Sequence, residues 1–271
     1  MDPATLIGIV GALGALLAMI YLEGASVTSI LLPAPMLLVF GGSLAVTVAS
    51  VTLPDSIRAF KALPKAFTAK VPSPHAQIEQ VVSLAERARK DGLLALEQEA
   101  ENVNDPFLKR ALQGIADGVD PEDLRAMLEE EMITRERTSR ADAKFYTTMG
   151  GYAPTIGIIG TVVSLTHVLE NLSDPEHLGH MIAAAFVATL WGVLSANMIF
   201  LPVGNRLVRV AELETERMTL LLEGMMAVQA GSQPRALRER LLVMVPPGPA
   251  PKAKAAKDDA PAAAPAAAEA V

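Results

Sequence analysis

Two threonines, Thr161 and Thr189, are the polar side chains of this chain best placed to handle an ion. They lie in two apolar stretches, about residues 151–169 and 181–201, that contain no Asp, Glu, Lys or Arg. If both stretches are antiparallel helices, each threonine lies about eight residues from their shared turn, at a depth of about 12 Å. Two hydroxyls at one depth can solvate a passing ion or contact a partner carboxylate. The alternative is a bond from each hydroxyl to the carbonyl four residues earlier.

The missing carboxylate is informative because carboxylates inside a membrane usually mark ion relays. If ions move through this protein, the titrating carboxylate must come from another chain. His167 is the side chain of these stretches that titrates near neutrality. It could relay protons, or it could be a packed, hydrogen-bonded or interfacial histidine.

Small residues repeat at helical spacing along both stretches. Ala185, Thr189, Gly192 and Ala196 share one face of the second stretch. Small residues let helices approach closely in lipid, so this face could meet a partner or pack within one subunit.

Pro154 and Pro202 lie at the opposite ends of the two stretches from their shared turn. Proline starts or stops a helix readily. The two residues could therefore mark helix ends, or they could be hinges between membrane helices and their extensions.

Four apolar runs organise the chain, each near the ~20 residues that cross a ~30 Å hydrocarbon core. They span about residues 5–22, 35–53, 151–169 and 181–201. All 23 Lys and Arg residues fall in two other blocks, 14 in 54–149 and nine in 204–271. Basic loops stay on the cytoplasmic side. We therefore expect a protein of the plasma (inner) membrane with four transmembrane helices and both termini cytoplasmic.

The short connections 23–34 and 170–180 carry acidic residues but no Lys or Arg, which places them outside. The first apolar run has no basic segment before it, since only Asp2 precedes Leu6. We therefore expect it to be a retained membrane helix rather than a signal peptide.

The composition excludes several classes of function. The chain has no cysteine, so it offers no disulfide or thiolate metal site. Its net charge of −7 gives no support for nucleic-acid binding. No nucleophile–base pair, metal cluster or phosphate loop is present, so we expect no enzyme, no catalytic or metal-binding residues and no cofactor.

The expected fold class is therefore all-α, a polytopic membrane protein with a helical cytoplasmic domain. Amphipathic spacing predicts helices on both sides of Gly92, and Asp105-Pro106 and Asp120-Pro121 predict helix starts. The helix after Pro121 should continue into the third span, and 211–229 should continue the fourth. The expected divisions are residues 1–53 (spans one and two), 54–149 (cytoplasmic loop), 150–203 (spans three and four), 204–245 (helical extension) and 246–271 (a disordered Pro/Ala-rich tail).

Five motifs in this order on this topology resemble the MotA/PomA flagellar stator subunits of the MotA/TolQ/ExbB group. The loop stretch ARKDGLLALE and the third-span stretch YAPTIGIIGT are two of them. The motifs lie at residues 88–97, 152–161, 171–179, 186–202 and 223–235. The resemblance runs from Leu6 to about Val245 and excludes the tail.

The resemblance implies that the chain is a stator subunit of the flagellar motor. Five such subunits would surround two copies of a MotB/PomB-like partner, which brings the membrane aspartate and a peptidoglycan-binding domain. Ion passage would turn or shift this homo-oligomeric ring and exert torque on the rotor's switch-complex protein. Arg89 and Glu97 match the rotor-contacting positions, and Pro154 and Pro202 match the family's functional prolines. Because Gly92 separates Arg89 from Glu97, we expect two separate contacts rather than an internal pair.

The transported ion stays open between H⁺ and Na⁺. Thr161 resembles sodium-driven members, whereas the run 183–192 is equally typical of proton-driven ones. The alternative function is a TolQ/ExbB-type energiser of another envelope process. Those relatives typically have three spans with the large loop after the first, which differs from the order here. A stand-alone transporter would need an ionisable residue in spans three and four, where this chain has no Asp, Glu, Lys or Arg.

Overall fold

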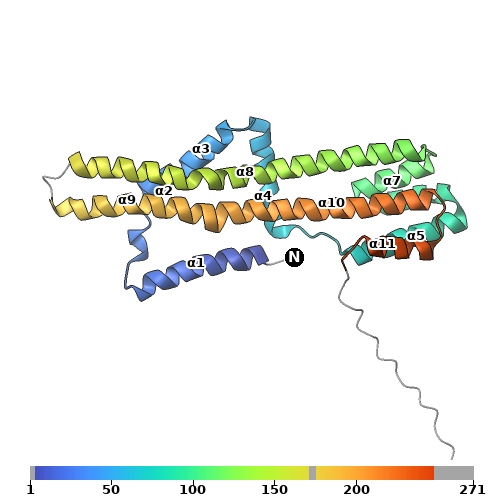
Figure 1. Ribbon diagram of the computed structural model, residues 1–271, viewed down its shortest axis with the longest axis horizontal. Helices are drawn as coiled ribbons and strands as arrows, with labels where there is room; N and C mark the ends of the chain where they lie inside the picture. The colour runs from blue at the N-terminus through green and yellow to red at the C-terminus, as the bar shows by residue number, and fades with distance from the viewer. Residues whose placement is uncertain (1–3, 171–174, 247–271) are drawn as a thin grey trace, which may run out of the picture.

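Two long helical rods lie side by side along the whole molecule (Figure 1). The structure is a computed structural model that describes residues 4–170 and 175–246, and its regular structure in these ranges is entirely helical. One rod is α8, Pro121–Glu170, a helix of 50 residues. The other consists of α9 (Pro175–Ser195), the π-helical segment η4 (Ala196–Phe200) and α10 (Leu201–Gln229). The all-helical expectation is confirmed, as is the continuation of both apolar stretches into polar helices.

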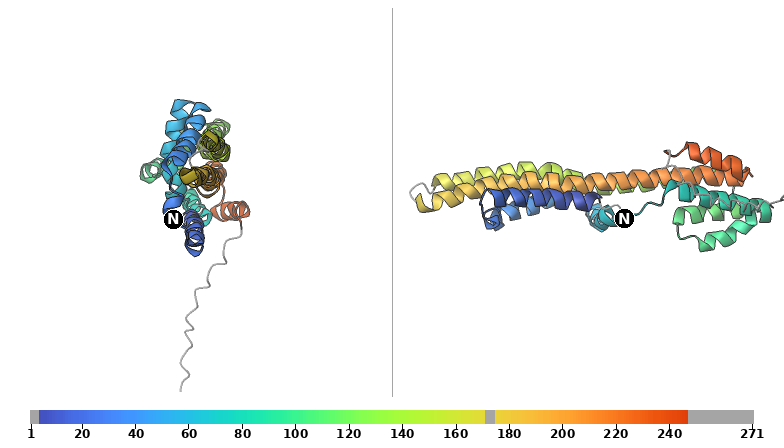
Figure 2. Two further views of the ribbon diagram at one scale, coloured as in Figure 1. Left: turned by 90° about the vertical axis from the view of Figure 1, so that its left-hand side faces the viewer. Right: turned by 90° about the horizontal axis from the view of Figure 1, so that it is seen from below.

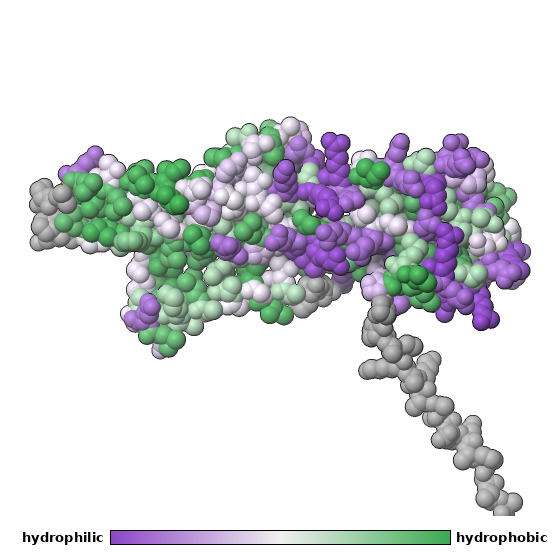
Figure 3. Space-filling view, in the orientation of Figure 1, coloured by the Kyte–Doolittle hydropathy of each residue, from purple (hydrophilic) through white to green (hydrophobic). Residues whose placement is uncertain are grey.

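The start of α8 shows how the local sequence determines where this rod begins. The Asp120 carboxylate accepts a hydrogen bond from the Glu122 backbone N–H at 2.9 Å, and Pro121 occupies the first turn. Such a start satisfies the otherwise unpaired N–H groups of the first turn. From there the helix runs without a break through a charged half into an apolar half. Figure 3 shows the result, since hydrophobic residues gather at one end of the molecule and hydrophilic residues at the other.

Further apolar helices lie at the hydrophobic end. Helix α1 (Ala4–Leu22) runs beside η4 and α10, and Figure 2 shows its position from two more sides. After the short helix η1 (Val27–Ser29), a continuous helix with a π-helical middle covers Pro33–Ala49. Its parts are α2 (Pro33–Met36), η2 (Leu37–Gly41) and α3 (Gly42–Ala49). Within the described residues, α1, α8 and the helix Met181–Gln229 are long and apolar enough to cross a membrane, and Pro33–Ala49 is shorter.

The second apolar run ends earlier than predicted. We expected it to reach Leu53, but α3 ends at Ala49 and Leu53 is the first residue of α4, Leu53–Thr68. Thr52 has an extended backbone, and its hydroxyl accepts a hydrogen bond from the Asp55 N–H at 3.3 Å. Thr52 is therefore a helix cap, and apolar composition alone did not reveal it. Helix α4 then runs across the two rods instead of along them (Figure 1).

The hydrophilic end is a helical bundle packed on the far ends of the rods. Its helices are α5 (Pro74–Asp91), η3 (Leu93–Ala95), α6 (Leu96–Asn102), α7 (Pro106–Ala116) and α11 (Pro234–Val243). Gly92 ends α5 with a positive φ of 85°, as its position predicted. Asp105 caps α7 by accepting from the Phe107 N–H at 2.9 Å, so this predicted start is also confirmed. The bundle core joins these helices to α8 and α10 through fully buried side chains including Phe107, Leu112, Leu124, Leu221 and Met225.

The rods approach most closely where two glycines face each other. A Cβ atom added to Gly192 would lie 2.8 Å from the Ala153 carbonyl oxygen and 3.1 Å from the Gly157 Cα. A Cβ added to Gly157 would lie 2.8 Å from the Ala188 carbonyl oxygen. These neighbours are backbone atoms, which cannot move aside as a side-chain end could. Both glycines are therefore required by the spacing of α8 and α9.

Gly192→Ala should destabilise the chain by about 1–3 kcal/mol, because the added methyl group overpacks a backbone contact. Gly151→Ala is the matched control, since nothing lies within 4 Å of a Cβ at that helical position. The control should be neutral or stabilising by up to about 1 kcal/mol. Thermal unfolding of both variants in detergent measures the difference, and equal melting temperatures would show that the rods can separate freely.

Candidate functional site

The two threonines singled out in the sequence meet between the rods. Their Oγ1 atoms are 2.5 Å apart, and both side chains are partly buried. The Thr161 Oγ1 also lies 2.9 Å from the Ala185 carbonyl oxygen and 3.1 Å from that of Gly157. The two hydroxyls thus lie side by side, as their equal distances from the turn predicted, and the back-bond to the carbonyl four residues earlier is present as well for Thr161.

This arrangement has a simple chemical consequence. A threonine hydroxyl has one proton to donate and two lone pairs to accept with. Thr161 therefore donates to only one of its three oxygen neighbours at a time, which leaves an oxygen-lined point between α8 and α9. Hydroxyl and carbonyl oxygens are ligands suited to small hard cations. The geometry is compatible with transient ion solvation, and the role of the pair in an ion pathway stays a prediction.

The small-residue face of the second rod is used inside the chain. Gly192 packs on α8, and Ala185 and Ala196 are each 1% exposed. Of the two interpretations left open for this face, packing within the subunit accounts for these three residues. Thr189 joins the same contact through its hydrogen bond to Thr161.

Neither proline ends a helix. Pro154 lies inside α8, and Pro202 lies in the first turn of α10 directly after the π-helical segment η4. The interpretation of these residues as helix ends is therefore wrong, because the helix continues through both. Proline cannot donate a backbone hydrogen bond, so each position weakens its rod locally. The Pro154 Cα also lies 3.3 Å from a Cβ built on Gly192, which places this weak point at the closest contact of the rods. Hinge action at the two positions stays a prediction.

His167 lies on the surface of α8 near its end. Its side chain is 65% exposed, and its Nδ1 is 3.9 Å from a carboxylate oxygen of Glu170. Of the predicted outer turn, residues 171–174 lie outside the described residues. The part of the predicted tail beyond residue 246 lies outside them too.

Arg89 and Glu97 lie on opposite sides of the Gly92 break, as predicted. Arg89 is exposed in the last turn of α5, and Glu97 is exposed in the first turn of α6. Among the described residues, neither makes a hydrogen bond or ion pair, whereas the nearby Arg87 and Glu99 pair with each other. The structure thus leaves both charges available to an outside partner.

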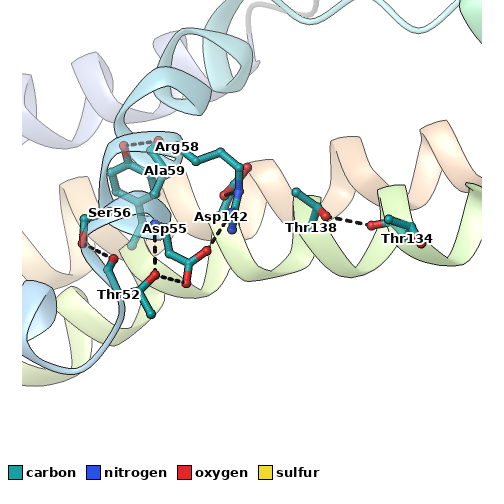
Figure 4. Close-up of polar contacts among 9 residues, drawn as sticks. Thr52, Asp55, Ser56, Arg58, Ala59, Thr134, Thr138 and Asp142 are labelled. Carbon is teal, nitrogen blue, oxygen red and sulfur yellow. Dashed lines mark hydrogen bonds and ion pairs between the residues drawn. The ribbon is translucent and has the colours of Figure 1, made fainter.

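Sequence reasoning missed a polar junction that fixes α4 to α8 (Figure 4). Arg58 on α4 donates from Nε to Asp142 on α8 at 2.7 Å and from Nη1 to Asp55 at 2.6 Å. The Asp142 side chain is only 9% exposed. Tyr146 on α8 donates to the Ala59 carbonyl oxygen of α4 at 3.0 Å. Arg58 and Asp142, like Tyr146 and Ala59, are more than 80 residues apart in the chain. No local spacing could therefore have predicted these two contacts between α4 and α8.

Burial gives Tyr146 a distinctive titration. It raises the pKa of the phenol to about 12, and the charge on Asp142 acts in the same direction. The phenol is therefore neutral at physiological pH and remains a donor to α4.

A second missed contact involves the chain's single tryptophan. Trp191 on α9 donates its indole N–H to the Ile30 carbonyl oxygen at 2.6 Å, and its ring centroid lies 5.7 Å from that of Phe40. This contact ties the segment before α2 to α9, two residues beyond Thr189. The single tryptophan of the chain was the available signal, but the sequence does not identify the acceptor of its indole N–H.

In the part of the chain that the structure describes, no three His, Cys, Asp or Glu residues gather closely enough to hold a metal ion. The threonine pair and the indole contact join separate segments at the membrane end.

Comparison with known proteins agrees with this layout. Residues 99–220 match the model of the MotA/TolQ/ExbB proton channel family. The chain is 34% identical over 251 residues to motility protein A of Bacillus subtilis (strain 168), covering 91% of this chain and 92% of that protein. The match thus extends over nearly the whole length of both chains.

Two solved structures are also similar. The structure of C. jejuni MotAB superposes with a TM-score of 0.87 at 26% identity, covering 91% of this chain and 96% of that chain. The flagellar MotAB stator complex from Bacillus subtilis gives a TM-score of 0.83 at 33% identity, covering 90% and 96%. The similarity therefore includes the long rods and the helical bundle together.

Tyr146→Phe should remove one tyrosine ionisation near pH 12 from the absorbance titration of the folded chain. An unfolded tyrosine ionises near pH 10. The unfolded state therefore loses its proton first, and the stability linked to Tyr146 is full below about pH 10 and falls as the pH rises towards 12. In the variant this alkaline loss should shrink. A wild-type titration in which every tyrosine ionises near pH 10 would contradict the buried phenol.

Proposed function

This chain belongs to the motility protein A group of the MotA/TolQ/ExbB proton channel family and is a flagellar stator channel subunit, and we propose that it turns ion passage into torque with a carboxylate supplied by a partner. The observation that carries the proposal is that the apolar stretches of the two rods around Thr161 and Thr189 contain no Asp, Glu, Lys or Arg. Neither apolar stretch holds an Asp or Glu that could take up and release a proton. The TolQ/ExbB-type alternative is set aside because the chain belongs to the motility group.

We propose four membrane spans, with the helical bundle and both termini in the cytoplasm. The segregation of all Lys and Arg into two blocks supports this orientation. The segment Pro33–Ala49 supplies the second span, although it is shorter than the other three. The host membrane is then the plasma (inner) membrane, as expected from the basic blocks.

The proposed assembly is a pentamer around two copies of a MotB/PomB-like, peptidoglycan-anchored subunit. The membrane half of α8 supports it, since one side of this helix is unusually exposed for large apolar residues. Ile158, Ile159, Val162 and Val163 are 55–63% exposed. Such a surface must be covered by lipid or by neighbouring helices.

The mechanism we propose for coupling uses the two prolines. Ion transfer to the partner carboxylate beside the threonine pair would change the charge of that carboxylate. Pro154 lies seven residues before Thr161 in α8, about 10 Å along the helix. Bending at Pro154 and Pro202 would then carry the change into α10 and the cytoplasmic half of α8. These helices continue without a break into the bundle that would face the rotor.

The proposed rotor contact is made by Arg89 and Glu97 with the switch-complex protein. Both charges are exposed and without partners among the described residues. Exposed charge pairs are individually worth about 0.2–1 kcal/mol, which suits a contact that must form and break repeatedly.

For the ion, we propose sodium, with protons as the alternative. The support is the set of three oxygens within 3.1 Å of the Thr161 Oγ1, since sodium needs oxygen ligands and a proton does not.

Conduction should require the partner. The purified chain alone in liposomes should pass no cation current, whereas the chain co-reconstituted with its MotB/PomB-like subunit should conduct. Fluxes driven by separate sodium and pH gradients identify the ion. A cation current from the chain alone would overturn the proposal that the titrating carboxylate comes in trans.

The Thr161→Ala variant of the complex is the matched test of the ion. It should lower sodium flux about tenfold or more, because one hydroxyl ligand and its bond to Thr189 are lost, with each hydrogen bond worth about 1 kcal/mol. Thr161→Ser keeps the hydroxyl and should retain most of the flux. Equal fluxes in all three proteins would leave the threonine pair a packing contact only.

The charge reversals Arg89→Glu and Glu97→Arg should each reduce swimming while leaving ion flux through the complex unchanged. The physical reason is that both groups lie in the bundle, far from the apolar halves of the rods. The matched control is Arg87→Glu, whose side chain pairs internally with Glu99. A swimming defect that always accompanies lost ion flux would place these charges in folding or conduction instead.

A further inference from the structure

Helix α4 lies where the apolar part of the molecule meets the polar part. Only three residues separate the end of α3 from the start of α4, so α4 cannot lie far from the end of the second apolar segment. Its contacts to α8 fall at Asp142 and Tyr146, just before the apolar stretch 151–169 begins. Figure 3 places this level at the border between the hydrophobic and hydrophilic halves, and Figure 1 shows α4 lying across the rods there. In a membrane, α4 would lie along the bilayer surface.

The two faces of α4 differ as an interfacial helix requires. One face is buried against the rods through the small residues Ser56, Ala59, Ala62 and Ala66. Large apolar side chains on another face are exposed at helical spacing: Leu53 is 65% exposed and Ile57 is 49% exposed. Phe60 is 44% exposed, although one side of its ring packs against Phe145 of α8 with the ring centroids 5.4 Å apart. Such residues are placed to enter the acyl boundary of a membrane.

Basic side chains lie along one side of this apolar stripe. Lys61 and Lys65 lie about 70–110° around the helix from the centre of the stripe, and Lys70 follows the end of α4. All three side chains are exposed, and within the described residues none of these side chains makes a hydrogen bond or ion pair. Arg58 on the same helix differs, because Asp55 and Asp142 neutralise it.

We propose that Lys61 and Lys65, with Lys70 beside them, form a binding site for anionic phospholipid headgroups of the cytoplasmic leaflet. The apolar stripe fixes the depth of α4, and the free ammonium groups meet the phosphates at that depth. Basic residues at a membrane surface are attracted to anionic lipid in this way. Since Arg58 and Tyr146 fasten α4 to α8, the bound lipid would hold the cytoplasmic half of α8 at a fixed height. This site goes beyond the ion and rotor chemistry proposed above.

The site can be tested on the full chain without ion flow. The detergent-purified protein is titrated with phosphatidylglycerol or with phosphatidylcholine, and bound lipid is counted by native mass spectrometry. The wild type should retain phosphatidylglycerol in preference to phosphatidylcholine. The double variant Lys61→Gln/Lys65→Gln should bind phosphatidylglycerol about 25-fold more weakly, or about five-fold for each lysine removed.

The matched control is Lys90→Gln/Lys109→Gln, which removes two charges from the bundle end and should keep wild-type lipid binding. Equal retention of the two lipids by the wild type would overturn the proposal, as would an equal loss in both double variants. The same spectra report the oligomeric state. Dissociation of the oligomer in Lys61→Gln/Lys65→Gln alone would show that the lysines contact a neighbouring subunit, and would also overturn it.

Discussion

The close contact between α8 and α9 is the constraint on which the other features depend. Gly157 and Gly192 allow backbone to touch backbone, and this spacing brings Thr161 within 2.5 Å of Thr189. A larger residue at either glycine would separate the rods and the hydroxyls together. The same contact includes Pro154, so the weak point of α8 lies directly against α9. Packing, polar chemistry and flexibility therefore share one location.

Much of this arrangement could be predicted from the sequence because it depends on composition and period. Apolar runs identified the apolar helices, and equal distances from one turn predicted that Thr161 and Thr189 lie side by side. Asp105 predicted the start of α7 and Gly92 predicted the end of α5, because helix caps depend on residues only three or four positions apart. The predicted end of the second apolar segment was wrong, since Thr52 caps a new helix within a stretch that is apolar in composition.

The rest could not be predicted because it depends on long-range contacts. Arg58 donates a hydrogen bond to Asp142, which is 84 residues away in the chain, and Trp191 donates one to Ile30, which is 161 residues away. Nothing in the local pattern of either partner identifies the other. The π-helical segment η4 was not predicted either; it directly precedes α10, whose first turn contains Pro202. Of these features, the Arg58–Asp142 contact lies at the junction between the apolar and polar halves.

That junction determines how a movement of the apolar halves of the rods could be passed on to the helical bundle. A helix of 50 residues is about 75 Å long, so α8 would transmit the proposed tilt at Pro154 over its whole polar half. Without a support, such a tilt would swing the bundle about an undefined point. The Arg58–Asp142 and Tyr146–Ala59 contacts supply the support, because they hold α8 to α4 between Pro154 and the bundle. The polar half of α8 would then act as a lever about α4, and the motion at Arg89 and Glu97 would be defined by the height of that helix.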